Sequence, residues 1–160
     1  MRRRWLAAMV LGFLLVTPAG AAKKPHLSAR IHGHPLKSGG KRLQVESFST
    51  VFEIVASTKN VRFNRAMGIA CVAFDLASMP LPATLSQCNG TYQETRIGRR
   101  GASAKVWSGT GMQITVESFD GSTARGTFGG AFEVSGQGDG PAVIQNGKFN
   151  AVVTTVGPPG

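Results

Sequence analysis

The chain has 160 residues, with 18 lysines and arginines against eight acidic residues, and its formal net charge is +10. This length predicts one ordinary domain with its own core, and the sequence has no internal repeat of the kind that builds solenoids or propellers. The positive charge indicates attraction to anions, but charge alone does not identify a partner.

The N-terminus has the pattern of a secretory signal peptide. Arginines occupy positions 2–4, an apolar run follows at 5–16, and small residues after Pro18 end at Ala22. A run of about 12 apolar residues is too short to span a membrane, so we expect cleavage after Ala21 or Ala22 rather than a retained anchor. No cysteine stands at the cleavage position to carry a lipid.

Cleavage defines the expected domain organisation. Loss of the signal peptide, residues 1–22, removes three arginines, lowers the formal charge from +10 to +7 and leaves 138 of the 160 residues. We expect a single β-domain over 23–156, a disordered tail over 157–160 and no transmembrane segment in the mature chain. The compartment is predicted to be periplasmic or extracellular.

The first part of the mature chain predicts short strands. Leu27, Ala29 and Ile31 alternate with polar residues, and we expect Pro35 and the loop at 37–41 to end this strand. The stretch 43–58 predicts one bent strand or two short ones. A helix is the alternative there, because several apolar residues also have helical spacing, but the β-branched residues favour strands.

Two further strands, at 61–65 and 67–74, lead to the pair of cysteines. Cys71 and Cys88 are the only cysteines, and in an exported chain an even pair predicts a disulfide that contributes roughly 3 kcal/mol. The intervening stretch contains Pro80 and Pro82, so the bond would clip an irregular excursion onto the sheet. A redox or metal thiol pair is the alternative, but it lacks Cys-x-x-Cys spacing. Asn89-Gly90 predicts a turn just after the second cysteine.

The clearest signal is a hairpin over 112–134. Its two arms alternate apolar and polar residues and are joined near Asp120-Gly121. Both apolar faces reach one core only if even positions pair with even ones, for example Val116 with Gly126 and Glu117 with Arg125. This requires an odd loop, Asp120-Gly121-Ser122, or a two-residue turn plus a bulge.

Another hairpin is predicted before that one, with arms at 91–97 and 102–108. A last strand containing Val143, Phe149 and Val153 is predicted after a loop at 136–141. Many short strands punctuated by glycine turns predict an all-β fold, a single antiparallel β-sandwich or barrel of roughly 8–10 short strands.

The segment 109–153 resembles the C-terminal part of several uncharacterised families of small exported bacterial β-proteins. The similarity rests on a Gly-Thr-Phe strand at 126–128 and a closing Asn-Gly-Lys-Phe strand at 146–149. It implies an antiparallel β-domain in the cell envelope or outside the cell. Many relatives look lipid-anchored, and this chain departs from them by lacking the cysteine; the resemblance implies no catalytic residues.

The hairpin around positions 98–101 carries the strongest candidate site. Arg96, Arg99, Arg100 and Lys105 gather at its tip, and Tyr92 and Trp107 lie further down the same arms. Guanidinium groups bind phosphate or carboxylate bidentately, and an aromatic neighbour packs on sugar rings or bases, so the pattern predicts an anion-binding loop. The alternative is a solvated tip kept charged against edge pairing.

Other chemistry is weakly indicated. His32 and His34 would project from one side of a strand, with His26 on the same parity, yet a polar strand face explains them better than a zinc site. Ser103 lacks the surroundings of a nucleophile elbow, the acidic residues are scattered singly, and no dinucleotide motif is complete, so we expect no metal, cofactor or catalytic residues.

These observations predict an exported, non-catalytic binding module for anionic ligands: anionic polysaccharide, lipopolysaccharide or phospholipid head groups. The alternative is a protein–protein interaction part, such as an inhibitor or an assembly component that binds another envelope protein. A hydrolase is the least favoured class, because it would need a deep pocket with convergent acids or histidines.

Overall fold

The computed structural model describes residues 24–48, 50–60, 62–72, 76–99, 101–134 and 140–155. The predicted signal peptide and the predicted tail lie outside these residues. Within them the chain forms one nine-stranded sheet and one short 3-10 helix, η1 (Gly40–Arg42), so the all-β prediction is confirmed. The strands are β1 (His26–Ile31), β2 (His34–Gly39), β3 (Leu43–Ser47), β4 (Val51–Lys59), β5 (Phe63–Val72), β6 (Ala83–Gly98), β7 (Gly101–Phe119), β8 (Thr123–Val134) and β9 (Ala142–Thr155).

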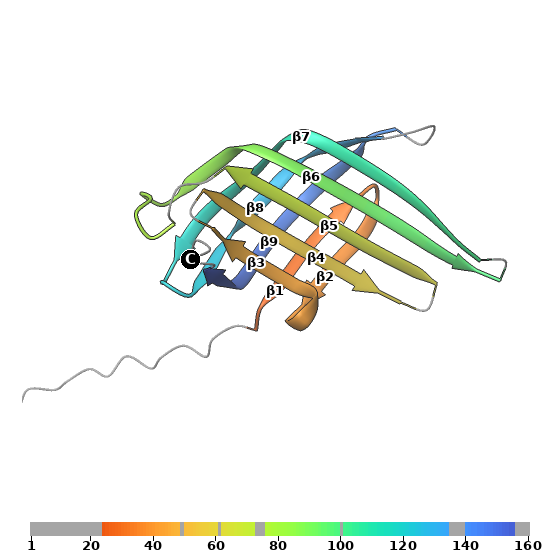
Figure 1. Ribbon diagram of the computed structural model, residues 1–160, viewed down its shortest axis with the longest axis horizontal. Coiled ribbons are helices and arrows are strands. Elements are labelled where there is room, and N and C mark those ends of the chain that lie inside the picture. The colour runs from red at the N-terminus through yellow and green to blue at the C-terminus, as the bar shows by residue number, and fades with distance from the viewer. Residues whose placement is uncertain are drawn as a thin grey trace, which may run out of the picture.

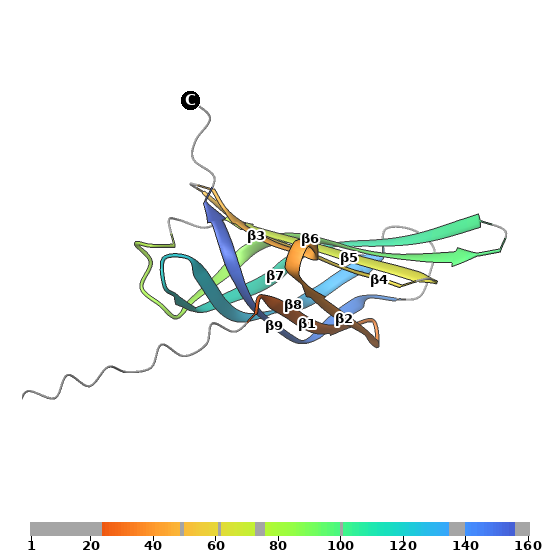
Figure 2. The same cartoon turned by 90° about the horizontal axis from the view of Figure 1, so that it is seen from below.

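The sheet closes into a barrel rather than a sandwich. Its strand order is β2-β1-β9-β3-β4-β5-β6-β7-β8, and a further pairing of β8 with β9 closes the ring through β3 to β9. The hairpin of β1 and β2 lies outside the ring, because β9 carries β1 along its first part and β3 beyond it (Figure 1). The β3–β9 pair is parallel, whereas the other pairs are antiparallel. Figure 2 shows that the barrel is flattened.

The strand alternation explains the core. Along most of the length of the strands alternate side chains face the shared core, and these inward positions are mostly apolar. Aromatic residues fill much of the interior: Phe52 packs against Phe149, and Tyr92 contacts both Trp107 and Phe132. Among the described residues no helix is long and apolar enough to cross a membrane.

The hairpin predicted over 112–134 is formed by β7 and β8. Val116 pairs with Gly126 as predicted, but Arg125 pairs with Ser118 rather than with Glu117, because Glu117 is the extra residue of a bulge. Of the two connections that parity allowed, the chain uses the turn plus bulge. Asp120 Oδ1 accepts hydrogen bonds from the backbone N–H groups of Ser122 and Thr123 and so caps this turn.

The disulfide prediction is also confirmed. Cys71 and Cys88 are bonded, and they are direct partners on β5 and β6. The residues between these strands that the structure describes, 76–82, are outside the sheet, and Leu76 among them is buried. The bond therefore ties the base of an irregular excursion to the barrel wall, as the sequence indicated.

Several strand ends differ from the prediction. The first strand ends earlier, at the His32-Gly33 turn, and Pro35 and part of the predicted loop at 37–41 lie within a second strand, β2, where an edge position tolerates the missing N–H of Pro35. The strands predicted at 61–65 and 67–74 form one strand, β5, up to Val72. The stretches predicted at 102–108 and from 112 onward likewise form one strand, β7, with a register shift between Ser108 and Gln113.

The turn predicted at Asn89-Gly90 is wrong, because β6 runs straight through it. A Cβ on Gly90 would lie 2.9 Å from the Phe132 ring and 3.0 Å from the carbonyl oxygen of Gly68. Glycine is therefore needed at this position for close packing rather than for chain reversal.

Candidate functional site

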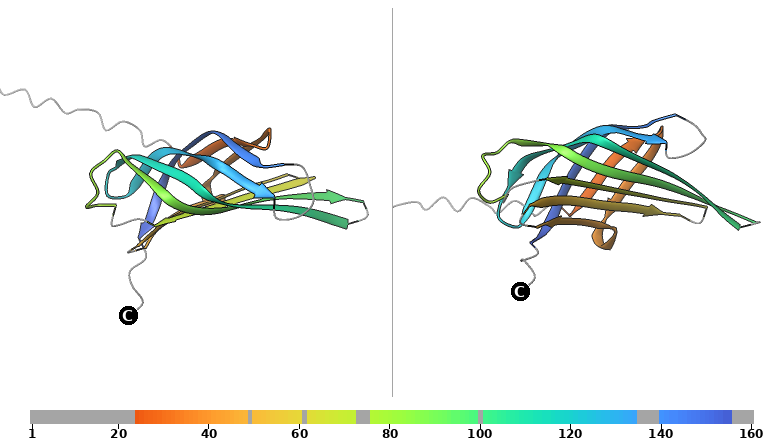
Figure 3. Two further views of the ribbon diagram at one scale, coloured as in Figure 1. Left: turned by 90° about the horizontal axis from the view of Figure 1, so that it is seen from above. Right: turned by 45° about the horizontal axis from the view of Figure 1, so that its top comes forward.

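Strands β6 and β7 run on past their neighbours at one end of the barrel, which we call the hairpin end (Figures 1 and 3). Pairing of the described residues on β5 with β6 reaches Phe63 opposite Arg96, and pairing on β8 with β7 reaches Val134 opposite Trp107. The two strands continue as a ribbon to the pair Gly98 and Gly101. The opposite end, which holds the disulfide, is the disulfide end.

Cross-strand register brings two of the four predicted anion-binding residues, Arg96 and Lys105, and both predicted aromatic neighbours onto one face of this ribbon. Tyr92 pairs with Trp107, and two residues further out Glu94 pairs with Lys105. Arg96 is the next inward position. Arg99 is exposed at the tip, away from the pocket described next, and Arg100 lies outside the described residues.

A pocket of about 300 Å³ lies on this inner face. Two histidines from the turn between β1 and β2 close one side of it. Its lining residues are His32, His34, Phe63, Glu94, Arg96, Ser103, Lys105 and Trp107. Arg96, Lys105 and Trp107 thus come together as the sequence predicted.

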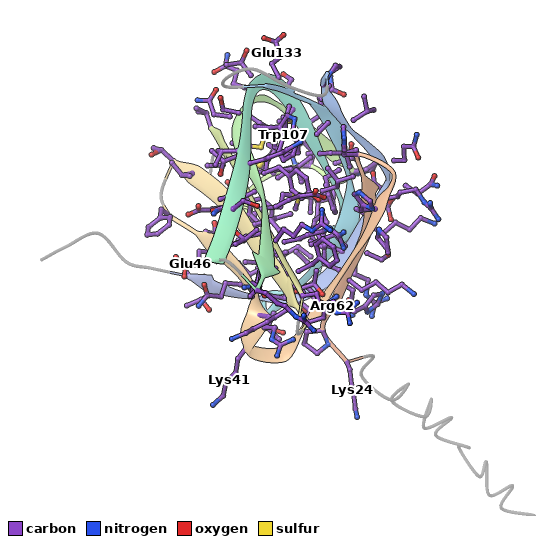
Figure 4. All side chains as sticks on the ribbon, turned by 90° about the vertical axis from the view of Figure 1, so that its right-hand side faces the viewer. Lys24, Lys41, Glu46, Arg62, Trp107 and Glu133 are labelled. Atoms are coloured by element: carbon purple, nitrogen blue, oxygen red, sulfur yellow. A yellow bond between two sulfur atoms is a disulfide. The ribbon has the colours of Figure 1, made fainter. Side chains whose placement is uncertain are left out.

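The floor of this pocket is a stack of rings. Trp107, which is 2% exposed, has its ring 5.4 Å from the rings of both Tyr92 and His32, and Figure 4 shows it within the barrel mouth. Its Nε1 donates a hydrogen bond to the carbonyl oxygen of Gly140 at 3.2 Å. The ring is held from several elements, so it presents a fixed apolar floor.

The acidic residue in the lining is already engaged. Glu94 Oε1 accepts hydrogen bonds from the Tyr92 hydroxyl at 2.6 Å and from Arg65 Nε at 3.0 Å, the latter an ion pair. Burial, and then the hydrogen bond to Glu94, raise the pKa of Tyr92 far above its ordinary value, so the phenol stays neutral. Glu94 is the one carboxylate among the residues that line the pocket, against Arg96 and Lys105, so the formal charge of the lining is positive.

The guanidinium groups of Arg65 and Arg96 lie over the ring of Phe63. The guanidinium carbon of Arg65 lies 5.5 Å from the centre of this ring, and that of Arg96 lies 5.9 Å from it. Both distances are within the range of cation–π attraction, which favours this placement of Arg96 beside the pocket.

The histidine arrangement differs from the prediction. His32 lies in the turn with a positive φ of 49°, so His32 and His34 do not share one strand face, and their ring centres are 6.3 Å apart. His26 lies at the far end of β1 and pairs with Gly39. In the described part of the chain no group of three histidine, cysteine or acidic side chains could hold a metal ion.

Sequence reasoning missed several lining residues. Phe63, Glu94 and the histidines join the site through pairing of β5 with β6 and through the placement of the β1–β2 turn. Glu94 could have been found, because it has the parity of Tyr92 and Arg96 on one arm. No local signal marks Phe63 or the histidines as neighbours of that arm.

A second, larger cavity of about 650 Å³ lies on the outer face of the same strands. Small side chains form its floor and two carboxylates, Glu53 and Glu133, line it. Figure 4 shows Glu133 pointing away from the barrel, opposite in direction to Trp107. The strands thus separate a basic inner pocket from an acidic outer groove.

A comparison of the chain with protein-family models, with curated proteins and with solved structures found no match in any of the three. The geometry and charge of the hairpin end are therefore what bear on the function of the chain.

Proposed function

We propose that the protein is an exported binding module for anionic ligands of the cell envelope or its surroundings, and that the inner pocket of the hairpin end is the binding site. The observation that carries this proposal is the charge of the pocket. Its lining carries Arg96 and Lys105 against one carboxylate, Glu94, which also accepts hydrogen bonds from Arg65 and Tyr92.

The size and lining of the pocket support one small anionic group. A volume of about 300 Å³ is at the lower end for ligand pockets, which suits a single sugar-sized or headgroup-sized unit rather than a long chain. Arg96 offers a planar guanidinium suited to phosphate or carboxylate, and Phe63 and His32 offer rings against which a sugar can pack.

Two observations support export. The basic, apolar and small-residue order of the N-terminus has the features of a signal peptide. The bond between Cys71 and Cys88 is typical of oxidising compartments.

The alternative function, binding of a protein partner, has less support, because the edge strand of the sheet is poorly suited to pair with another chain. The edge strand β2 carries Pro35 and Lys37, and both residue types discourage pairing with another chain.

The test compares two double variants that lose equal charge. Arg96→Ala with Lys105→Ala removes two cations that line the pocket, and Lys37→Ala with Lys41→Ala removes two exposed cations from elsewhere. On heparin and immobilised lipopolysaccharide over a salt gradient, we expect the first variant to elute at much lower salt and to bind about tenfold more weakly, a loss of about 1.4 kcal/mol. Equal elution of the two variants would show that only net charge matters and would refute the site.

A further inference from the structure

The outer face of the projecting hairpin is apolar where its inner face is basic. Alternation along both strands places Ile97, Ala102, Ala104 and Val106 outward, together with neutral Gln93 and Thr95. Ile97 is 42% exposed and Val106 is 43% exposed. No charged side chain of the described residues interrupts this face between Gln93 and the tip. The hairpin is therefore a two-faced ribbon that extends from the barrel.

Cations surround the ribbon at the same end. The turn between β4 and β5 carries Lys59 and Arg62, and Arg62 is adjacent to the ribbon because its carbonyl oxygen accepts a hydrogen bond from the N–H of Ile97 at 2.9 Å. Arg96 and Arg99 add charge on the inner face and at the tip. Among the described residues of β6, β7 and β8, the outward-facing acid closest to the tip along the strands is Glu133, opposite Ser108.

We propose, on the basis of the proposed function, that the hairpin end docks on a membrane surface that contains anionic phospholipids. The apolar outer face with Ile97 enters the boundary between headgroups and acyl chains. Arg62, Arg96 and Arg99 bind lipid phosphates, and the inner pocket accommodates one headgroup.

The combination of faces favours a lipid surface over a soluble polyanion. A soluble polyanion would be bound by the cations alone and would leave Ile97 and its apolar neighbours in water. The membrane interface offers phosphate and apolar surface within a few ångströms, which is the arrangement that amphipathic elements with basic residues recognise. Charge complementarity and apolar exposure on one ribbon therefore indicate the same occupant.

The experiment uses vesicles of phosphatidylcholine with and without phosphatidylglycerol, and soluble heparin as a probe of charge alone. Ile97→Ser removes the main apolar side chain of the outer face. Its matched control is Val152→Ser, which removes a valine that is 55% exposed on β9 at the disulfide end. We expect Ile97→Ser to weaken binding to phosphatidylglycerol vesicles about tenfold at near-physiological salt and to leave heparin binding unchanged. Val152→Ser should change neither.

The outcomes separate this inference from the proposed function. If Ile97→Ser binds the anionic vesicles as well as the wild type does, or if heparin is bound and the vesicles are not, lipid docking is wrong while anion binding stands. If neither heparin nor the anionic vesicles are bound, both proposals are wrong. Equal binding to vesicles with and without phosphatidylglycerol would also overturn the inference, because phosphate recognition would then play no part.

Discussion

The two ends of the barrel are built from the same strands and differ in how their side chains are used. At the disulfide end, Cys71 and Cys88 join β5 to β6, and Asp120 fastens the turn between β7 and β8 with backbone hydrogen bonds. At the hairpin end, β6 and β7 continue beyond the barrel, and Arg96 and Lys105 line an open pocket. The disulfide and the capped turn thus lie at one end, and the proposed binding site lies at the other.

Removal of the disulfide should have the largest effect of the substitutions considered. It should lower the stability of the protein and leave ligand affinity unchanged. For Cys71→Ala with Cys88→Ala, we expect a loss of about 3 kcal/mol in the free energy of unfolding, because the bond closes a loop with a sequence separation of 17. Chemical denaturation measures this loss. Heparin affinity of the folded variant should equal that of the wild type, and a large loss of affinity would contradict the separation of the two ends.

A methyl group at Gly90 should destabilise the region between the ends. Its Cβ would press on Phe132, whose ring stacks on Tyr92 beneath the pocket, so Gly90→Ala should cost about 1–3 kcal/mol in thermal or chemical unfolding. Gly68→Ala is the matched control, since its Cβ would lie 3.7 Å from Thr91 Oγ1 and would face the outer groove. If both variants unfold alike, the close packing around Gly90 is not what requires glycine.

Tyr92 should make the hairpin end sensitive to alkali. Its pKa is raised in the folded state, so its contribution to stability is full below the unfolded value of about 10 and is lost as the pH rises above it. Tyr92→Phe should cost roughly 1–2 kcal/mol at neutral pH and should flatten the alkaline decline.

The measurement is direct because the chain has a single tyrosine. Tyrosinate absorbance in the native protein should not appear until well above pH 10, or until the protein unfolds. Ordinary titration near pH 10 in the folded state would show that the hydroxyl is not held by burial and Glu94.

Substitution of Asp120, which lies at the disulfide end, should have the smallest effect on stability. This effect should change at acid pH, whereas that of Tyr92 changes at alkaline pH. Hydrogen bonds from the backbone of Thr123 and Ser122 lower its pKa, so its contribution is present above the unfolded value of about 3.9 and is lost as the pH falls below it. Asp120→Ala should lower the melting temperature at pH 7 by less than the disulfide variant does, and the difference from the wild type should shrink in acid. Glu117→Ala, in the adjacent bulge, is the control and should leave the melting temperature unchanged.

Local pattern was enough to predict much of this molecule, for a physical reason. Whether a side chain on a strand faces the core depends on residues two positions apart, and turn geometry depends on a few neighbouring residues. The sequence could therefore indicate the pairing of Val116 with Gly126, a bulge as one of two solutions, and a hairpin that carries Arg96 and Lys105 on its two arms. The disulfide followed from a different signal, the presence of two cysteines in a chain with an export signal.

Where local pattern misled, a distant contact decided the outcome. Asn89-Gly90 has the composition of a turn, yet the Phe132 ring and the neighbouring strands hold it extended. His32 and His34 looked like one strand face, and the turn between them became visible only in the folded chain. A local rule cannot weigh these contacts because the partners lie far away in the sequence.

By itself, the sequence determined that the chain is all-β, most of the residues that alternate toward the core, that Cys71 bonds to Cys88, and which hairpin carries clustered cations. Only the tertiary structure decided that the sheet closes into a barrel, because closure depends on β9 pairing with β8 on one side and with β1 and β3 on the other. It also decided that Phe63 and His32 join Arg96 in one pocket. These outcomes depend on pairings between strands distant in sequence, which the alternation of a single strand leaves undetermined.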